Sequence, residues 1–279
     1  MIPQGAWLVE YGRVARHPAA GFVSGATDAR QTPFCFAVIA SGPAATLIDV
    51  GFSAPFHQRR LSEKYGGGQW TTPVGALARI GIPAEAVAAI ALTHKHFDHA
   101  GAVADFPHAE VVLQRCEVDR HRLALRDPAR FALELRATDP DLLETLAHSR
   151  LRLVDGPATA GPVRLHLAAD THTPGSQYAV LDTAEGPLVF PGDNVCAYQN
   201  VEGDGRRPAP IPIGSMTGPV RNWLALAGEL TDAVAGDTRR IIPFHDDAVW
   251  DRYPAATFPD ALHIAALTSS TPLPSAPAR

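Results

Sequence analysis

One short segment of the sequence is rich in groups that bind metal ions. Residues 93–99 read Thr-His-Lys-His-Phe-Asp-His, so three imidazoles and one carboxylate lie close together, directly after an apolar run. Imidazole nitrogens and carboxylate oxygens together suit zinc and similar divalent ions. If the backbone stays extended, His94 and His96 project in the same direction, whereas Asp98 and His99 follow the turn. The segment therefore predicts ligands for two metal ions at the end of a strand.

Three more candidate ligands lie further along the chain, each at the end of an expected strand: His172, Asp193 and His245. We expect the first ion to be bound by three imidazoles, those of His94, His96 and His172. We expect the second ion to be bound by one carboxylate and two imidazoles, those of Asp98, His99 and His245. Asp193 can bridge the two ions, because a carboxylate has two oxygens that each accept a metal.

A pair of ions held in this way has a definite chemical use. Two ions separated by roughly 3.5–4 Å lower the pKa of a shared water from about 16 toward neutrality. The bridging hydroxide is a nucleophile that needs no serine or cysteine, and the same ions stabilise charge on the attacked carbonyl and on the leaving oxygen. Zinc is the expected metal, although iron or manganese can use the same ligands. The ligand set therefore predicts a di-metal hydrolase, in which we assign Asp98 a catalytic role as well.

Composition and charge exclude several classes of protein. The net charge is −5, the pI is about 6.2, and no cluster of Lys and Arg is longer than two residues, so a nucleic-acid partner is not expected. No apolar run approaches the roughly 18 residues of a membrane span, and no secretory signal is visible at the N-terminus. Three widely spaced cysteines argue against a disulfide framework. We expect a cytoplasmic monomer or homodimer with no membrane partner.

The rest of the chain supplies elements that would position the ligands. Alternating or continuous apolar runs predict strands at Pro33–Ser41, Ala45–Val50, Ala88–Leu92, Glu110–Gln114, Val163–Ala168, Leu188–Phe190 and Arg240–Pro243. Residues 219–234 have the period of an amphipathic helix, and we also expect a short helix at 258–267. Strands that alternate with outer helices indicate an α/β layered fold.

Two segments stand apart from this pattern. Residues 117–150 are charged, rich in Leu and Ala, and helical in period, which predicts a helical insertion beside the pocket. Residues 268–279 are rich in Ser and Pro, which predicts a flexible C-terminal tail. We therefore expect one domain over residues 1–267, followed by that tail.

Two charged residues near the predicted site, Asp49 and Lys95, are not expected to bind metal themselves. Asp49 ends an expected strand, where a buried carboxylate needs a partner. It either supports a metal-bound histidine or caps the following turn, and we favour the first role. Lys95 lies between two ligands and is expected to point away from the metal ions toward solvent.

Taken together, the motifs resemble the metallo-β-lactamase superfamily. The resemblance spans nearly the whole chain and is carried by TLIDVG (46–51), LTHKHFDHAG (92–101), THTPGS (171–176), FPGDN (190–194) and PFHDD (243–247). It implies a four-layer αββα sandwich with the metal ions at one edge of the two sheets. HFDHAG followed by VVLQRCEVD is most similar to the N-acyl homoserine lactonase group, whose members carry helices beside the pocket where residues 117–150 stand here.

The resemblance also has a departure. Lactonases of that group often have a tyrosine three residues after the bridging aspartate, but here that position is Cys196 and the nearest tyrosine is Tyr198. The phenol of Tyr198 either polarises a carbonyl or protonates the leaving alkoxide, or it packs on the pocket wall. We expect the residues of 117–150 and 194–215 to decide what is attacked.

The favoured function is opening of a lactone or related ester, with a small molecule as the partner. A thioester hydrolase of the glyoxalase II type is the first alternative, although that type uses basic groups near its C-terminus and this one has only Arg279. A biosynthetic enzyme that uses the same ions for non-hydrolytic chemistry is the second. A non-catalytic metal-binding or sensor protein is the third, and it is disfavoured because no ligand is missing.

Overall fold

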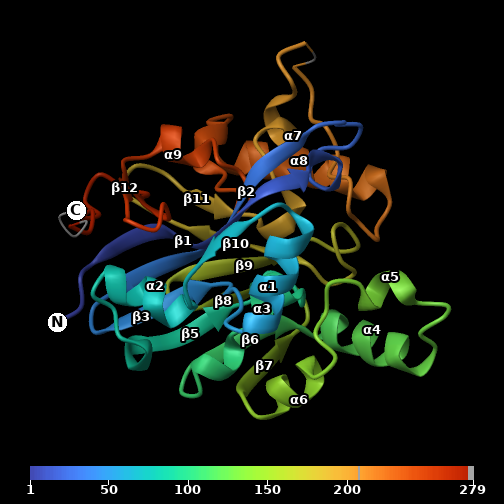
Figure 1. Ribbon diagram of the computed structural model, residues 1–279, viewed down its shortest axis with the longest axis horizontal. Helices are drawn as coiled ribbons and strands as arrows, with labels where there is room; N and C mark the ends of the chain where they lie inside the picture. The colour runs from blue at the N-terminus through green and yellow to red at the C-terminus, as the bar shows by residue number, and fades with distance from the viewer. Residues whose placement is uncertain (207, 276–279) are drawn as a thin grey trace.

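The computed structural model describes residues 1–206 and 208–275. Two β-sheets lie face to face in it, with helices on the outside (Figure 1). The larger sheet has the strand order β12-β13-β1-β2-β3-β5-β6-β7, with β4 paired to β1, and the smaller sheet has the order β11-β10-β9-β8. The strands are β1 (Gly5–Pro18), β2 (Ala29–Ser41), β3 (Ala44–Ile48), β4 (Gly68–Trp70), β5 (Val87–Ala91), β6 (Glu110–Gln114), β7 (Arg150–Val154), β8 (Ala158–Ala160), β9 (Val163–Leu167), β10 (Gln177–Leu181), β11 (Leu188–Phe190), β12 (Ala255–Thr257) and β13 (His263–Ala266).

Helices and short 3-10 turns connect these strands. The α-helices are α1 (Pro55–Lys64), α2 (Pro73–Arg79), α3 (Phe97–Ala100), α4 (Arg115–Arg126), α5 (Ala132–Leu135), α6 (Leu142–Ala147), α7 (Gln199–Glu202), α8 (Val220–Ala233) and α9 (Val249–Arg252). The 3-10 turns are η1 (Ala19–Gly21), η2 (Ala84–Ala86), η3 (Val103–Asp105), η4 (Gly192–Asn194) and η5 (Thr238–Arg240). No described helix is long and apolar enough to cross a membrane.

The layers follow from the two-residue period of the strands. In β2, Phe36 and Val38 point to the cluster beneath α1 and α2, whereas Cys35 and Ala37 point to the cluster between the two sheets. In the smaller sheet, Val189 of β11 faces away from the larger sheet and packs in the same cluster as the α8 residues Leu226 and Leu230. Three apolar interfaces therefore separate four layers, and the predicted αββα sandwich is confirmed.

The edge of the larger sheet that carries the predicted ligands is formed by parallel strands. β3, β5, β6 and β7 run parallel to one another, so their carboxyl ends meet at one edge. The segments that follow β3, β5 and β6 contain Asp49, the His-rich loop and Glu117. Clefts in α/β folds form at such an edge, because loops leave the sheet there side by side.

Residues 258–267 differ from their prediction, whereas residues 117–150 are helical as expected. Residues 258–267 were expected to form a helix, but they contribute the strand β13, because backbone pairing with β1 outweighs local propensity. Residues 117–150 contain α4, α5 and α6, and α4 and α5 lie together at one side of the molecule (Figure 1).

Part of the predicted C-terminal tail contacts the domain. Thr271 is buried, and its hydroxyl accepts a hydrogen bond from the backbone N–H of Ala6 at 2.9 Å. The indole of Trp7 donates to the carbonyl of Pro272 at 2.8 Å. The last part of the tail, residues 276–279, lies outside the described residues.

Candidate metal centre

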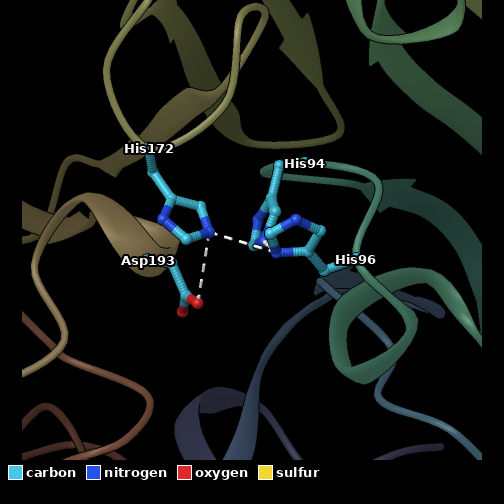
Figure 2. Close-up of side chains that lie close together, drawn as sticks. All are labelled: His94, His96, His172 and Asp193. Atoms are coloured by element: carbon cyan, nitrogen blue, oxygen red, sulfur yellow. Dashed lines mark hydrogen bonds and ion pairs between the residues drawn. The ribbon is translucent and has the colours of Figure 1, made fainter. Parts of the chain in front are cut away.

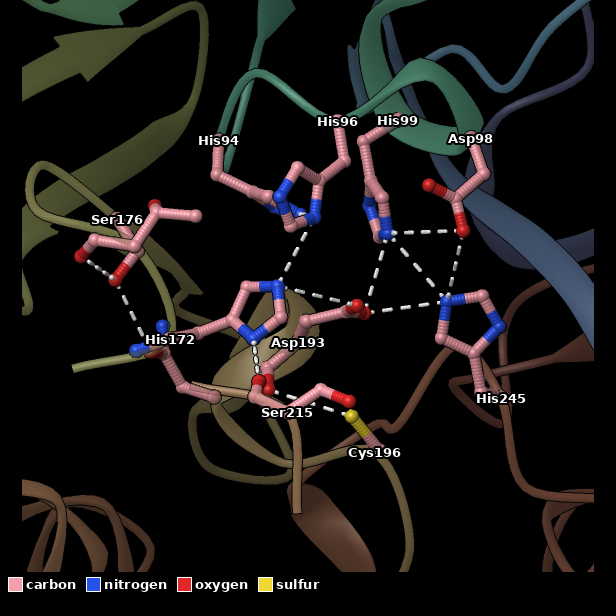
Figure 3. A network of polar contacts seen from close by, with 12 residues as sticks. His94, His96, Asp98, His99, His172, Ser176, Asp193, Cys196, Ser215 and His245 are labelled. Carbon is pink, nitrogen blue, oxygen red and sulfur yellow. Dashed lines mark hydrogen bonds and ion pairs between the residues drawn. The ribbon is translucent and has the colours of Figure 1, made fainter. Parts of the chain in front are cut away.

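The structure brings all seven predicted ligands together in two groups (Figures 2 and 3). Within each group, one ligand atom from every residue lies within 4.8 Å of the others. The first group is His94, His96, His172 and Asp193, and the second is Asp98, His99 and His245. The six ligands assigned to separate ions in the sequence fall into these same two groups, with Asp193 added to the first.

Asp193 lies between the two groups and faces each with a different oxygen (Figure 3). Its Oδ1 is 3.1 Å from Nε2 of His99 and 3.1 Å from Nε2 of His245, and its Oδ2 is 3.5 Å from Nε2 of His172. The turn η4 that carries it depends on Gly192, whose φ is 57° and where a Cβ would lie 2.4 Å from Oγ1 of Thr93. The carboxylate therefore faces both groups of histidines at once, and its role as a bridge between two ions stays a prediction.

In the first group the imidazoles converge on one another. Nδ1 of His96 lies 3.0 Å from Nε2 of His94 and 3.1 Å from Nε2 of His172 (Figure 2). Their rings come from two loops, one after β5 and one before β10. Three ring nitrogens this close need a proton or a cation between them, because lone pairs that face each other repel.

The outer nitrogens of three ligands are held by acceptors. Nδ1 of His99 lies 2.7 Å from Oδ2 of Asp49, Nδ1 of His172 lies 2.6 Å from the carbonyl of Ser215, and Nδ1 of His245 lies 2.9 Å from the carbonyl of Pro33. Since carbonyls and carboxylates only accept, each Nδ1 is the donor. Each neutral ring therefore turns the lone pair of Nε2 toward the centre, which is the tautomer that a metal ligand needs.

The interpretation of Asp49 as support for a metal ligand agrees with these contacts. Besides His99, its carboxylate accepts from the backbone N–H of Thr93 at 2.7 Å and from the Thr93 hydroxyl at 2.8 Å. Its φ is 61°, a left-handed conformation that Asp tolerates better than most residues. Asp49 thus orients both the start of the His-rich loop and the ring of His99.

Electrostatics differ between the two groups. Burial, reinforced by the neighbouring histidines, holds the pKa of His94 and of His96 well below the usual value. Burial opposes charge on His99 too, but Asp193 and Asp49 outweigh it and raise the pKa of His99 well above the usual value. The second group therefore attracts positive charge, as protons at low pH or as a cation.

The donor set fits divalent metal ions. Oδ1 of Asp193 is buried and accepts no hydrogen bond from any described residue, although two ring nitrogens lie 3.1 Å away. A buried carboxylate oxygen without a donor is costly unless a cation compensates it. Nitrogen and oxygen ligands in this ratio suit zinc, iron or manganese. The side chains of both groups therefore fit a site for divalent metal.

A buried ion pair lies behind the ligand loops. Glu117 of α4 accepts hydrogen bonds from the backbone N–H of Lys95 at 3.1 Å and of Gly175 at 2.7 Å. The Lys95 ammonium is 3.5 Å from the same carboxylate, and both side chains are almost fully buried. The expectation that Lys95 reaches solvent is therefore wrong, because the insertion covers it. Glu117 ties the loop of His94 and His96 to the loop of His172.

The cluster borders a cavity of about 570 Å³. The ligands His96, Asp98, His172, Asp193 and His245 line it. Apolar walls come from side chains spread along the sequence: Phe22, Phe34, Leu61, Phe97, Leu133 and Met216. The segments 117–150 and 194–215 both contribute lining residues, as predicted. A small-molecule substrate can therefore reach the cluster.

Tyr198, the other predicted catalytic residue, lies elsewhere. Its ring is buried among residues between the sheets and lines a separate pocket with Glu202 and Arg252. The Arg252 guanidinium is 3.4 Å from the ring centroid. Within the described part of the chain, the hydroxyl of Tyr198 has no hydrogen-bond partner. A packing role fits these contacts, whereas a direct role at the metal centre does not. Cys196 lines the cavity instead.

Comparison with known protein families identifies the family of the chain. A family model described as "Metallo-beta-lactamase superfamily" matches residues 34–245. The chain belongs to the metallo-β-lactamase superfamily. The match runs from β2 to His245, so it includes every predicted ligand. Members of this superfamily are generally metal-dependent hydrolases. A search of the curated proteins found no match.

Solved structures share the fold at low sequence identity. An N-acyl homoserine lactone hydrolase with N-hexanoyl-L-homoserine bound at its catalytic metal centre matches with a TM-score of 0.65 and 18% identity, covering 90% of this chain and 96% of the other. AidC, a dizinc quorum-quenching lactonase, matches with a TM-score of 0.63 and 16% identity, covering 88% of this chain and 90% of the other. A probable metal-dependent hydrolase from Staphylococcus aureus matches with a TM-score of 0.67 and 13% identity, covering 88% of this chain and 91% of the other.

Sequence reasoning missed several contacts of the centre. The carbonyls of Ser215 and Pro33 fix two histidine tautomers, yet a backbone acceptor leaves no signal in the residue type. Glu117 did have a signal, because it is an acidic residue that closely follows the buried strand β6. The argument that identified Asp49 would have identified Glu117 too.

Proposed function

We propose that the protein is a di-metal hydrolase that opens a lactone or a related ester. The observation that carries this proposal is Asp193, which faces two separate histidine groups with its two oxygens and borders a cavity. The lactone hydrolases among its structural neighbours support the substrate class. All three cysteines are unpaired, which supports the proposed cytoplasmic location.

Two ions bound here would supply an activated water and stabilise negative charge on the attacked carbonyl and the leaving oxygen. We propose the first position for His94, His96 and His172, and the second for Asp98, His99 and His245. Zinc is the proposed metal, and iron and manganese suit the same atoms.

The side chains of the centre have separate tasks in this proposal. Asp193 fixes the spacing of the two groups, and Asp49 and Glu117 hold the loops in place. Asp98 is the ligand carboxylate with the larger exposed fraction, at 15% against 11% for Asp193. We assign it to accept the proton of the attacking water and to return it to the leaving oxygen. The apolar walls exclude bulk water around the ester.

A substrate panel tests the proposal. Zinc-loaded protein is assayed with lactones of several ring sizes, with linear esters and with thioesters, and the chelated protein is the control. We expect turnover of at least one lactone or oxygen ester with kcat/KM well above that of the thioesters. Turnover of thioesters alone would establish the glyoxalase II type of activity in its place. No turnover of any of the three would leave non-hydrolytic chemistry and contradict the proposal.

A further inference from the structure

The lining of the cavity includes three cationic side chains. Arg60 and Lys64 lie one helical turn apart on α1, and Arg136 follows α5 in the insertion. All three line the same cavity as the metal cluster, and all three are exposed. The helix α1 and the segment of Arg136 are far apart in the sequence, so the tertiary structure alone brings them to one cavity.

These cations have no carboxylate partner among residues 1–206 and 208–275. Two acids near the cavity bind other residues, since Asp139 binds Nε2 of His57 at 2.7 Å and Glu134 binds Arg120 at 2.8 Å. The carboxylates that line the cavity belong to the metal cluster. The side chains of Arg60, Lys64 and Arg136 are therefore free to bind an anion from outside the protein.

Phe97 connects the cations to the metal cluster. The Arg60 guanidinium lies 5.3 Å from the centroid of the Phe97 ring, and the backbone N–H of Phe97 donates to the carbonyl of Ala137 at 2.7 Å. Ala137 directly follows Arg136, and Phe97 stands between the ligands His96 and Asp98. Both arginine-bearing segments thus meet beside the ligand loop.

We propose that the substrate carries an anionic group, away from its scissile bond, that binds Arg60, Lys64 and Arg136. This inference rests on the proposed hydrolase function and specifies its substrate class. Like charges four residues apart on a helix repel each other, so a bound anion relieves a cost that the free protein bears. Guanidinium groups bind carboxylates through two parallel hydrogen bonds, which gives direction as well as attraction.

The substrate expected here differs from the product bound in one solved neighbour. The N-hexanoyl chain of the product bound in one of them carries no charge. A neutral acyl chain would leave the three cations here without a partner. We therefore expect N-hexanoyl-L-homoserine lactone to be a poor substrate relative to a lactone with an anionic side chain.

The test uses two lactones that differ only at the end of the side chain, one with a carboxylate and one with the isosteric carboxamide. The zinc-loaded protein should show a kcat/KM for the carboxylate that is about tenfold higher or more, as charge-assisted hydrogen bonds predict. This preference should fall as the salt concentration rises, because the cations are exposed. Equal kcat/KM for the pair, or preference for the carboxamide, would overturn the proposal.

Variants locate the preference in the cavity. Arg60→Gln combined with Arg136→Gln should reduce the ratio of the two kcat/KM values to about two or less, since the forked donors are removed. Arg59→Gln is the matched control, because Arg59 is exposed on the same helix but is not among the described lining residues. An equal loss in Arg59→Gln would assign the effect to the general charge of α1 and reject the proposed site.

Failure of the hydrolase proposal would be distinguishable from failure of this one. If neither lactone is opened, binding of the same pair to zinc-loaded protein is measured by calorimetry. Tighter binding of the carboxylate that is lost in the double variant would uphold the anion site without the hydrolase. Equal binding of the pair would reject the anion site.

Discussion

The carboxylate of Asp49 lies 2.7 Å from Nδ1 of His99, and both side chains are fully buried. Asp49 follows β3, whereas His99 belongs to α3 after β5, so the contact joins segments that follow neighbouring parallel strands. The donated Nδ1 proton leaves Nε2 of His99 facing Asp193. The orientation of one ligand therefore depends on a residue that does not face the cavity.

Replacement of Asp49 by Asn should weaken metal binding. The side chain keeps its shape but loses the charge that orients His99, and such supporting groups are typically worth about 10–100-fold in metal affinity. Chelator competition measures the affinity for each ion, and we expect the loss to fall mainly on one of the two. Asp182→Asn is the control, because Asp182 is exposed and pairs with Arg164. Unchanged affinity for both ions in Asp49→Asn would contradict the proposed role.

Asp193→Ala should cost the protein its second ion and most of its activity. The substitution removes the carboxylate that faces both groups, so His99 and His245 lose their shared partner. Elemental analysis after dialysis should give about one metal per chain in place of two. Two metals retained per chain would show that Asp193 is not a bridge. Asp155→Ala, at an exposed position, should keep both.

Glu117→Gln should destabilise the protein and weaken its metal binding together. The variant leaves the buried ammonium of Lys95 without a counter-charge, and breaking a buried pair costs about 3 kcal/mol or more. It also weakens the acceptors that join the two ligand loops. Urea unfolding and zinc competition measure the two effects, with Glu144→Gln on the exposed side of the insertion as the control.

A double variant separates the two effects of Glu117. Lys95→Met with Glu117→Gln removes both charges, so it should recover much of the unfolding free energy. The zinc affinity should stay low, since the link between the loops is still altered. Recovery of both quantities would mean that Glu117 acts only as the counter-charge of Lys95.

Zinc affinity should fall as the pH is lowered. The pKa values of His99 and His245 are raised because Asp193 and the other nearby carboxylates outweigh the burial that opposes charge on them. At a pH below the raised pKa values, both rings carry protons that the metal must displace. Zinc affinity is therefore highest at a pH above these pKa values and is lost as the pH falls through them. We expect a loss of about tenfold or more per pH unit. Competition with a chelator of known proton affinity between pH 8 and 6 checks this, and a flat profile would refute it.

Tyr198→Phe should leave activity within about twofold of the wild type, because its hydroxyl lies outside the cavity. Removal of a buried hydroxyl without a partner should also leave the free energy of unfolding unchanged or slightly increased. Steady-state kinetics and urea unfolding measure both quantities. A loss of kcat by about 100-fold, with an unchanged fold, would restore the catalytic interpretation of Tyr198.

The sequence was most informative where chemistry is local. Four ligands lie within one loop, and each remaining ligand follows a short apolar run, so residue type and spacing alone predicted the two groups. Strands that alternate with helices predicted an α/β layered fold, whereas the four-layer αββα arrangement was implied by the resemblance of the motifs to the superfamily. The helix predicted for residues 258–267 was wrong, because the strand β13 there pairs with β1, which is distant in the sequence.

The sequence by itself determined which atoms can bind metal and in what order they occur along the chain. Only the tertiary structure decided how they are held: the burial of Lys95 against Glu117, the exclusion of Tyr198 from the cavity, and the carbonyls that orient His172 and His245. It also decided that Phe97 contacts both Arg60 of α1 and the backbone of Ala137, which follows Arg136. The physical reason is common to all of these. Each depends on the packing of segments that are far apart in the chain, and the sequence of one segment does not show which distant segments pack against it.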